Sequence, residues 1–301
     1  MKYHVPVLLK PSVEALQVKP DGVYADLTFG GGGHTREVLS RLGDKGRLMA
    51  FDQDDDAMNN MPDDQRVIPV HANFRYVYRF MKYYNFSGFD GILADLGISS
   101  WQIDEKERGF SFRFDAELDM RMNRNAGVSA KGILSHYSYA QLKTLFRNYG
   151  ELKNAGVIAG KIVDAREQRP ISTTGDLVSI LSPVFKKGAE HKFLARVFQA
   201  LRIEVNGEMD ALREMLMKSV ECLVPGGRLV VLSYHSLEDR MVKNFMRAGN
   251  IDGHIEKDFY GNQISPIDVI TRKPVQAGPE EINENPRARS VKMRVAERKK
   301  Q

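Results

Sequence analysis

The sequence has little cysteine and no long apolar run. Of 301 residues one is a cysteine, Cys222, so disulfides within the chain and cysteine-rich zinc sites are excluded. No apolar run approaches the ~20 residues that a membrane-spanning helix needs. The first residues, MKYHVPVLLKPSVEAL, lack the features of a secretory signal. We therefore expect a cytoplasmic protein without a membrane partner.

The single cysteine also excludes two kinds of reaction on a nucleobase. A zinc-dependent deaminase needs several cysteines near an H-x-E motif. Methylation at a pyrimidine ring carbon uses a cysteine thiolate, whereas Cys222 lies in the apolar stretch VECLVPGG, where we expect it to be buried and inert. Any chemistry on a base therefore has to proceed without a cysteine nucleophile.

Charge of neither sign dominates the sequence. Lys and Arg number 44 and Asp and Glu 39, so the formal net charge is +5 at pH 7. A modest positive excess favours a polyanionic partner such as nucleic acid, although many enzymes carry as much for solubility alone. Charge alone therefore leaves the partner open.

Short apolar strands alternate with helical stretches in the N-terminal third. Residues 23–28, 47–54, 67–74 and 89–100 have the length and apolar content of buried strands. Strand, helix and strand in regular succession favour a mainly parallel sheet with helices on both faces. The sequence therefore predicts an α/β, Rossmann-like fold.

The next strand, RLVVLSYHS (228–236), comes too late for a simple α/β repeat. A single crossover helix occupies roughly 20 to 40 residues, and the intervening stretch is several times longer. Residues 106–206 have helical spacing and two sequences typical of helix capping boxes, which start at Ser138 and Thr173. We predict an inserted helical subdomain over 106–206, within an α/β domain made of 1–105 and 207–301.

A last strand is predicted in RSVKMRVAER (289–298). Apolar and basic residues alternate there, which is typical of an edge strand with one solvated face. The basic residues at this end of the chain either contact phosphates or only increase solubility.

Four consecutive glycines follow the first strand, in DLTFGGGGHT (26–35). Such a loop lets a ligand approach the backbone closely, and open α/β sheets bind ligands at the carboxyl ends of their strands. Asp52 ends the second strand, where a carboxylate accepts the ribose hydroxyls of a nucleoside cofactor. The loop and Asp52 therefore predict a nucleoside-cofactor site.

The acidic run DQDDD (52–56) also resembles the start of a calcium loop. Ala57 stands where that loop needs a glycine, so we expect no calcium there. No metal site is predicted elsewhere.

Two cofactors fit this site, a nicotinamide dinucleotide and S-adenosylmethionine. The dinucleotide fingerprint is G-x-G-x-x-G, because a pyrophosphate sits against the helix start. Counting from Gly30 or from Gly31, the third glycine position holds Thr35 or Arg36. S-adenosylmethionine has no pyrophosphate, so the spacing favours it, and a nicotinamide oxidoreductase is the alternative.

Several longer motifs carry a resemblance to one family. In chain order they are DLTFGGGGHT, FDQD, HANF, DLGISSWQ, ERGFSF, LDMRM, FQALRIEVN, LSYHSLEDR and ENPRARS. Together they resemble the bacterial small-subunit ribosomal RNA N(4)-cytidine methyltransferase family (RsmH), over nearly the whole chain. Trp101 departs from the smaller residue or proline that is common in relatives, and Gly31 occupies a variable position.

The resemblance implies a class I methyltransferase that uses S-adenosylmethionine and methylates the exocyclic amine of a decoding-region cytidine in 16S ribosomal RNA. The implied cofactor-binding residues, carried over motif by motif, are Gly32, Gly33, His34, Asp52, Phe74, Asp95 and Gln102. The implied partner is 16S ribosomal RNA, within the small ribosomal subunit, and the oligomeric state is left open between monomer and dimer.

The chemistry of an amino group suggests two catalytic candidates. A cytosine amine is a poor nucleophile, so the site has to align it with the methyl group and accept its proton. Asp95, with nearby backbone carbonyls, is the first candidate acceptor. DLGIS departs from the Asn-Pro-Pro-aromatic motif of many amino methyltransferases, so the proton acceptor stays open. His235 in SYHS is the second candidate, either as a neutral proton acceptor or as a contact to the edge of the cytosine. A histidine at a strand end also has an ordinary structural interpretation.

Recognition of RNA is expected from basic and aromatic side chains. RGFSFRFD (108–115) interleaves Arg108 and Arg113 with Phe110, Phe112 and Phe114, which suits phosphate contacts and base stacking. The alternative is that at least two of the phenylalanines anchor the insertion to the sheet. Further candidates, each with a salt bridge as its alternative, are Arg121, Arg202, Arg240 and Arg287. A non-catalytic RNA-binding relative is the remaining alternative for the whole chain.

Overall fold

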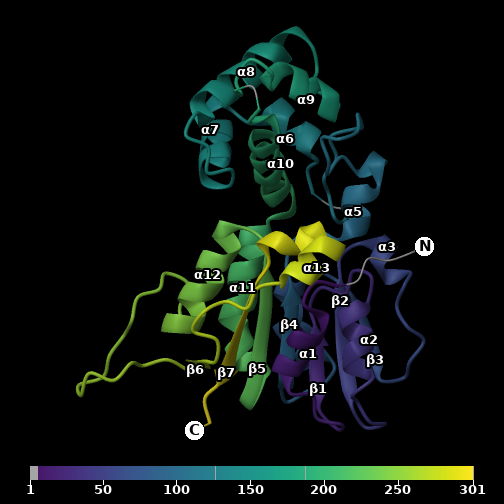
Figure 1. Ribbon diagram of the computed structural model, residues 1–301, viewed down its shortest axis with the longest axis vertical. Coiled ribbons are helices and arrows are strands. Elements are labelled where there is room, and N and C mark those ends of the chain that lie inside the picture. Colours follow the sequence, from purple (N-terminus) through teal and green to yellow (C-terminus); the bar gives the residue numbers. More distant parts are fainter. Residues whose placement is uncertain (1–5, 126, 187, 301) are drawn as a thin grey trace. The chain divides into compact units, whose positions relative to one another are not determined.

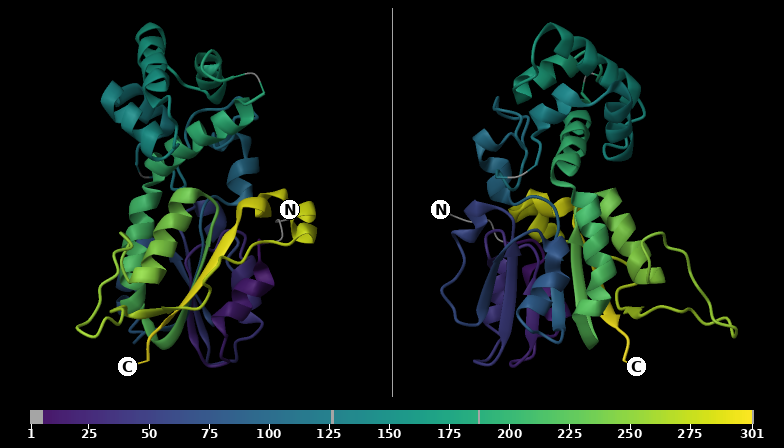
Figure 2. Two further views of the ribbon diagram at one scale, coloured as in Figure 1. Left: turned by 60° about the vertical axis from the view of Figure 1, so that its left-hand side comes forward. Right: turned by 180° about the vertical axis from the view of Figure 1, so that it is seen from behind.

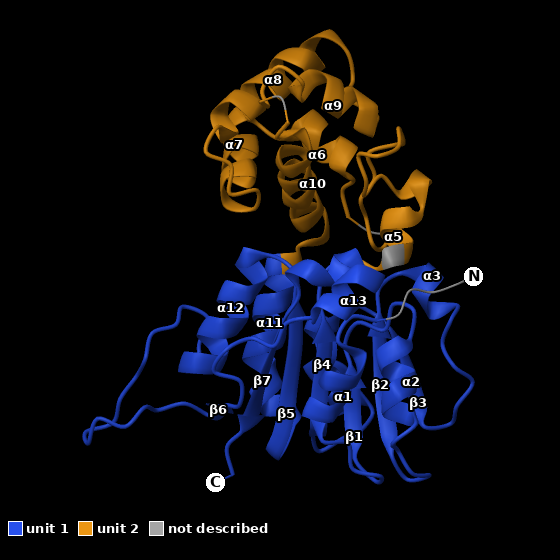
Figure 3. Ribbon diagram, viewed as in Figure 1, with its two compact units in different colours: residues 1–97, 209–301 blue, residues 98–208 orange. Residues whose placement is uncertain are grey.

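The computed structural model describes residues 6–125, 127–186 and 188–300. The chain divides into two compact units, residues 1–97 with 209–301 and residues 98–208 (Figure 3). The predicted boundaries lay at 105/106 and 206/207. Residues 98–105 belong to the second unit because Ile98 packs against its apolar core.

The first unit contains a seven-stranded sheet in its described residues, with the order β3-β2-β1-β4-β5-β7-β6 (Figure 1). β1 to β5 are parallel to one another, and β7 is antiparallel to its neighbours β5 and β6. The strands are β1 (Val23–Asp26), β2 (Arg47–Asp52), β3 (Val67–His71), β4 (Phe89–Asp95), β5 (Leu223–Ser233), β6 (Ile267–Val269) and β7 (Lys292–Arg298). The mainly parallel α/β sheet predicted from the sequence is confirmed.

Helices cover both faces of this sheet (Figures 1 and 2). The helices of the first unit are α1 (Leu9–Leu16), α2 (Gly33–Leu39), α3 (Asp55–Met58), α4 (Val77–Tyr83), α11 (Glu208–Cys222), α12 (Ser236–Ala248) and α13 (Pro279–Glu284), with short 3-10 helices η1 (Phe74–Tyr76) and η3 (Pro286–Ser290). Alternate strand residues point to opposite sides. In β2, Met49 joins the core under α4, α11 and α12, whereas Leu48 joins the core under α1 and α2.

The prediction that 289–298 forms an edge strand is wrong. β7 lies between β5 and β6, and Val295 and Ala296 on its two faces are both buried. Arg294 is accommodated inside the sheet because its Nε donates to Asp239 at 2.7 Å. β6 has three residues, too few for its apolar pattern to be recognised in the sequence.

The second unit is helical. Its elements are α5 (Ser100–Asp104), η2 (Lys106–Arg108), α6 (Ala130–His136), α7 (Tyr139–Asn148), α8 (Ala155–Gln168), α9 (Thr174–Leu181) and α10 (Glu190–Asn206). The capping boxes expected at Ser138 and Thr173 begin α7 and α9. One apolar cluster, which includes Phe146, Ile158 and Leu201, forms the core of this unit. Across the described residues of both units, no helix has the length and apolar content to cross a membrane.

Candidate active site

The carboxyl ends of four strands gather acidic and aromatic side chains in the first unit. β1 ends at Asp26, β2 at Asp52 and β4 at Asp95, and Tyr234 follows β5. The chain reverses its direction across the sheet between β1 and β4, which is where open α/β sheets bind their ligands. The predicted site residues Asp52 and Asp95 therefore lie at the expected edge of the sheet.

The glycine loop needs glycine at specific positions. Gly32 has a φ of +75°, and a Cβ there would lie 2.6 Å from the Phe29 ring. Gly33 begins α2, and a Cβ there would lie 2.0 Å from Cγ of Pro6. Because left-handed backbone and close contacts both disfavour side chains, these two glycines are structurally required. Gly31 is not among the glycines with positive φ.

His34 lies beneath the loop with a neutral ring. Burial lowers the pKa of its imidazole to about 4, and a hydrogen bond with the backbone of Val7 opposes that fall. Its Nδ1 is 3.8 Å from Oδ2 of Asp95, which at neutral pH is a contact between a neutral ring and a carboxyl group. Among the described residues its buried Nε2 has no hydrogen-bond partner. A buried donor without a partner is costly in free energy, so the site retains hydrogen-bonding capacity for a ligand.

Asp52 connects the second strand to the glycine loop. Its Oδ2 accepts from the Gly30 N–H at 2.8 Å and its Oδ1 from the Asp54 N–H at 3.0 Å. Burial raises the pKa of this carboxyl to about 6. The backbone of Gln53 also forms a hydrogen bond with this carboxylate. Three of its four lone pairs are then engaged, so Asp52 can hold the loop and still accept from a ligand hydroxyl.

Asp95 is the most perturbed carboxyl of the site. Its Oδ1 accepts from the Tyr234 hydroxyl at 2.7 Å, and its backbone N–H donates to the Thr28 hydroxyl at 2.7 Å. Burial raises its pKa to about 7, the Tyr234 hydrogen bond opposes that rise, and the charges of Asp26 and Glu238 add to it. A carboxyl with a pKa near neutrality is well matched to proton transfer.

Two residues of this network were not predicted from the sequence. Asp26 is buried and accepts from the Thr35 hydroxyl at 2.7 Å, and burial raises its pKa to about 6. Tyr234 donates to Asp95, and burial raises the pKa of its phenol. A lone acidic residue ending an apolar strand was a signal for Asp26. The sequence offers no comparable signal for Tyr234.

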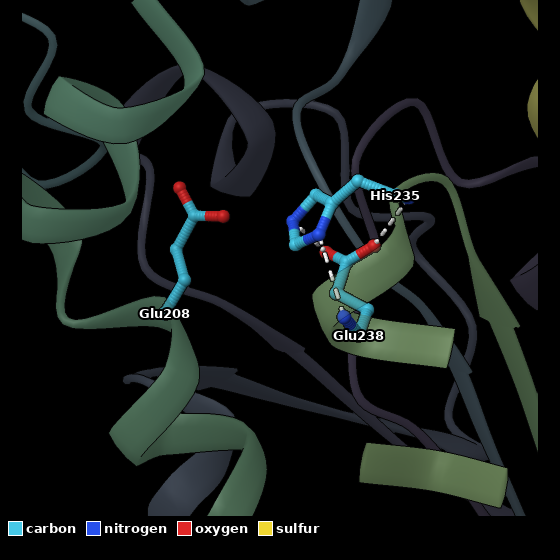
Figure 4. Close-up of side chains that lie close together, drawn as sticks. All are labelled: Glu208, His235 and Glu238. Atoms are coloured by element: carbon cyan, nitrogen blue, oxygen red, sulfur yellow. Dashed lines mark hydrogen bonds and ion pairs between the residues drawn. The ribbon is translucent and has the colours of Figure 1, made fainter. Parts of the chain in front are cut away.

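His235 has a clear structural role. It is the N-cap of α12, and its Nδ1 accepts from the Glu238 N–H at 3.3 Å (Figure 4). Glu238 Oε2 in turn accepts from the Tyr234 N–H at 2.8 Å. Glu208, drawn in the same figure, belongs to the other unit and forms an ion pair with Arg202 at 2.8 Å. The cap uses Nδ1, and Nε2 lies 3.2 Å from Oε1 of Glu238. Both ring nitrogens therefore face Glu238, which disfavours the predicted catalytic role.

Comparison with known proteins identifies the family. The profile of the MraW methylase family matches residues 1–299. The chain belongs to the MraW methylase family. The motif resemblance predicted from the sequence is thereby confirmed, and a family of methylases argues against the nicotinamide oxidoreductase.

Curated relatives of this MraW methylase match over their full length. Ribosomal RNA small subunit methyltransferase H of Bacteroides fragilis (strain YCH46) is 54% identical over 297 residues, 99% of this chain and 98% of the relative. The protein of the same name from Flavobacterium johnsoniae is 51% identical over 298 residues, 99% and 98% of the two chains. Among solved structures, an rRNA methylase from Streptococcus thermophilus is similar at 10% identity, with a TM-score of 0.41 and 99% of each chain covered.

Two other predicted cofactor residues of this MraW methylase have structural roles. Phe74 begins η1 after β3 and packs, half-buried, against the main core of the first unit. Gln102 is a buried residue of the second unit, where its Oε1 accepts from the Ser99 N–H at 3.1 Å in a capping box. Their contacts with a cofactor stay predictions.

Several RNA candidates are instead part of the fold. Arg108 is buried and donates to the carbonyls of Arg121 and Met122 at 3.0 and 3.1 Å, so the prediction of a phosphate contact is wrong for it. Phe110 and Phe112 pack into the core of the second unit. Their role is structural, but it lies within the insertion, and the predicted anchoring to the sheet stays a prediction. Arg121 forms an ion pair with Asp119 at 2.6 Å, and Arg202 forms one with Glu208.

The side chains of Arg113 and Phe114 are exposed, so both can still contact RNA. For Arg240 and Arg287, contact with RNA stays a prediction.

The perturbed carboxyl of Asp95 predicts an unusual dependence of stability on pH. Its pKa is raised from 3.8 to about 7 in the folded protein. Between these values the folded state holds a proton that the unfolded chain has released, so the free energy of unfolding falls as pH rises and levels off above about 7. Asparagine does not titrate. Above pH 7 we expect Asp95→Asn to be more stable than the wild type by about 2 kcal/mol, part of the shift being screened by solvent.

Urea unfolding from pH 4 to pH 8 measures this difference. Asp26 and Asp52 titrate in both proteins, so the difference between variant and wild type reports Asp95 together with its coupling to Asp26. Asp56→Asn, at an exposed position, serves as the control. A difference between Asp95→Asn and wild type that stays constant with pH would contradict the prediction.

Proposed function

We propose that this MraW methylase transfers a methyl group from S-adenosylmethionine to the exocyclic N4 amine of a decoding-region cytidine in 16S ribosomal RNA. The observation that carries the proposal is the half-buried Asp95 carboxyl, with a pKa raised to about 7, at the end of β4. The curated relatives named ribosomal RNA small subunit methyltransferases support the substrate class. The N4 position and the cytidine rest on the motif resemblance.

The residues present fit S-adenosylmethionine. The glycine loop follows β1 at the carboxyl edge of the sheet, and the Gly30 N–H donates to the Asp52 carboxylate there. The remaining lone pair of Asp52 can accept from a ribose hydroxyl, and the buried Nε2 of His34 supplies an unpaired polar atom. We propose that Gly32, Gly33, His34 and Asp52 hold the cofactor and that Phe74 flanks its adenine. A cofactor contact of Gln102 rests on the motif resemblance alone. The bound cofactor supplies a methyl group on a positively charged sulfur.

Proton removal is the step that this chain's own residues perform. The amine nitrogen gains the methyl carbon as the bond from that carbon to sulfur breaks, and the nitrogen then has to lose one proton. Among the described residues, Asp95 Oδ1 is engaged by Tyr234, so Oδ2 is the oxygen that accepts this proton. A proton acceptor of this kind contributes about 10²- to 10⁴-fold to the rate. His235, held as a helix cap, is the less suited of the two candidates.

We propose that the enzyme acts in the cytoplasm on the assembled small subunit. The test is incubation of the protein and S-adenosylmethionine with small subunits that lack the modification, followed by mass spectrometry of the nucleotides. N4-methylcytidine at a single decoding-region position is the expected product. Absence of methyl transfer at high enzyme concentration would favour the non-catalytic relative, and calorimetric binding of NAD without S-adenosylmethionine would favour the oxidoreductase.

Removal of the Asp52 carboxylate is expected to affect the cofactor more than the chemistry. Asp52→Ala should weaken binding of S-adenosylhomocysteine about 10- to 100-fold, since a hydrogen bond to a charged group contributes about 1.5 to 3 kcal/mol. At saturating cofactor, kcat should change much less. Calorimetry and steady-state kinetics measure the two effects, and Asp56→Ala, at an exposed position nearby, is the control. Unchanged cofactor affinity in Asp52→Ala would contradict the assignment.

A further inference from the structure

The segment FRYVYRFMKYYNF, residues 74–86, combines aromatic and basic side chains without acidic ones. It contains four tyrosines, two arginines and one lysine, and no aspartate or glutamate. Val77 and Met81 of α4 turn into the core of the first unit. The remaining side chains are partly or largely exposed, on the face of the sheet that α4 and α11 cover (Figure 2, right).

The tyrosines of this segment are unusually accessible. Tyr83 is 75% exposed, and Tyr84 and Tyr76 are each more than a third exposed. The ring centres of Tyr83 and Tyr84 lie 5.1 Å apart and their planes are at 89°, so the two rings are in edge-to-face contact. Contiguous exposed aromatic surface on a folded domain usually marks an interaction site.

Positive charge lies over the same tyrosines. The Arg79 guanidinium is 5.2 Å from the centre of the Tyr76 ring, and Nζ of Lys82 is 5.5 Å from that of Tyr78. Nζ of Lys218 in α11 also lies 5.1 Å from the centre of the Tyr78 ring, and Lys218 is neutralised by Glu221. In the described part of the chain, neither Arg79 nor Lys82 has an ion-pair partner.

Arg75 differs from its neighbours because it is neutralised. Its Nη2 lies 3.1 Å from Glu214 of α11. The uncompensated charge on this face is therefore positive, and it comes from Arg79 and Lys82. We define the α4 surface as the six residues Tyr76, Tyr78, Arg79, Lys82, Tyr83 and Tyr84.

We propose that the α4 surface binds a single-stranded or looped segment of the ribosomal RNA substrate. Phosphates contact Arg79 and Lys82, and bases stack on Tyr83 and Tyr84. Sequence-tolerant RNA contacts use this combination of unpaired cations and exposed aromatic rings. A protein partner is the less suited occupant, because the segment offers no acidic group to select one. The inference rests on the proposed function, since it takes the RNA substrate as the ligand.

Two double variants separate the contributions of stacking and charge. Tyr83→Ala with Tyr84→Ala should weaken binding of unmodified small-subunit RNA about tenfold, given the contribution of base stacking. Arg79→Ala with Lys82→Ala should reduce the slope of log affinity against log salt concentration by about 1.4, because each phosphate contact on a single strand contributes roughly 0.7. Filter binding at several salt concentrations measures both effects. Calorimetry should give unchanged affinity for S-adenosylhomocysteine.

Matched controls come from the same unit. Phe259 and Tyr260 are also adjacent, exposed and in edge contact, with ring centres 5.5 Å apart at 88°. Replacing both with alanine should leave RNA affinity unchanged, as should Lys45→Ala with Lys243→Ala at exposed positions. Tyr83→Phe with Tyr84→Phe, and Arg79→Lys with Lys82→Arg, should retain wild-type binding.

The experiment distinguishes failure of this inference from failure of the proposed function. If the wild type neither binds nor methylates small-subunit RNA, the proposed function fails. If the wild type does both while the two double variants keep full RNA affinity and salt dependence, the inference about the α4 surface is overturned. It is equally overturned if the variants keep RNA affinity and lose self-association in light scattering, because the surface is then a contact between protein chains.

Discussion

Replacing Asp95 with asparagine is expected to lower kcat for methyl transfer by about 10²- to 10⁴-fold. Asparagine has nearly the same shape and can still accept the hydrogen bond that the Tyr234 hydroxyl donates at 2.7 Å. It cannot take a proton. The loss therefore reports proton acceptance rather than disruption of the site. Single-turnover transfer of labelled methyl groups at saturating cofactor measures it.

The pH dependence of the wild type provides a second readout of Asp95. Its carboxyl has to be ionised to accept the amine proton, so kcat should rise with pH and level off above the pKa of about 7. Tyr234→Phe removes a hydrogen bond that lowers this pKa, so the rise should move to higher pH with a similar plateau. Equal turnover by Asp95→Asn and wild type at saturating cofactor would contradict the role of Asp95.

Gly33→Val is expected to weaken cofactor binding by about 100-fold or more, beyond what one lost hydrogen bond explains. A Cβ at Gly33 would lie 2.0 Å from Cγ of Pro6, so valine has to displace the N-terminal segment or the loop. Titration calorimetry with S-adenosylhomocysteine measures the loss. Gly31→Arg is the control, since Gly31 is not among the positive-φ glycines and its position varies in the family resemblance.

A double-mutant cycle separates two explanations of that loss. Pro6→Ala removes the Cγ atom that a side chain at Gly33 would meet. The cycle combines it with Gly33→Ala, the smallest substitution that adds a Cβ. If Gly33→Ala weakens binding through this clash, adding Pro6→Ala should restore much of the binding. If it acts by blocking the cofactor directly, the second substitution restores nothing. Full cofactor affinity in Gly33→Val would contradict both explanations.

The parts of this fold that local pattern decides were predictable from sequence. Buried parallel strands are short apolar runs, and the capping boxes at Ser138 and Thr173 begin helices as expected. The position of β7 was not predictable, because it depends on Asp239 neutralising Arg294 inside the sheet across 55 residues of sequence. An alternation of apolar and basic residues looks the same at an edge and beside a buried counter-charge.

In the candidate site too, residues that a local pattern places were predictable, and residues that a long-range contact places were not. Asp52 and Asp95 end apolar strands, so their position was predicted from the sequence. Tyr234 was missed because its hydrogen bond to Asp95 joins residues 139 positions apart. His235 illustrates the opposite case, in which a polar residue at a strand end has a structural role. The signal was Glu238, three residues later, which completes a capping box. Arg108 was predicted to contact phosphate, but its Nη2 donates to two backbone carbonyls inside the second unit.

The interior position of β7 has a consequence for biosynthesis. Residues 292–298 leave the ribosome after every other strand of the sheet, yet they pair with β5 on one side and β6 on the other. Until then, the long strand β5 presents an unpaired apolar edge, and such edges promote aggregation of incompletely folded chains. The second unit, residues 98–208, is synthesised before β5 and has its own core. Synthesis therefore completes the helical unit early and leaves closure of the catalytic sheet to the final residues.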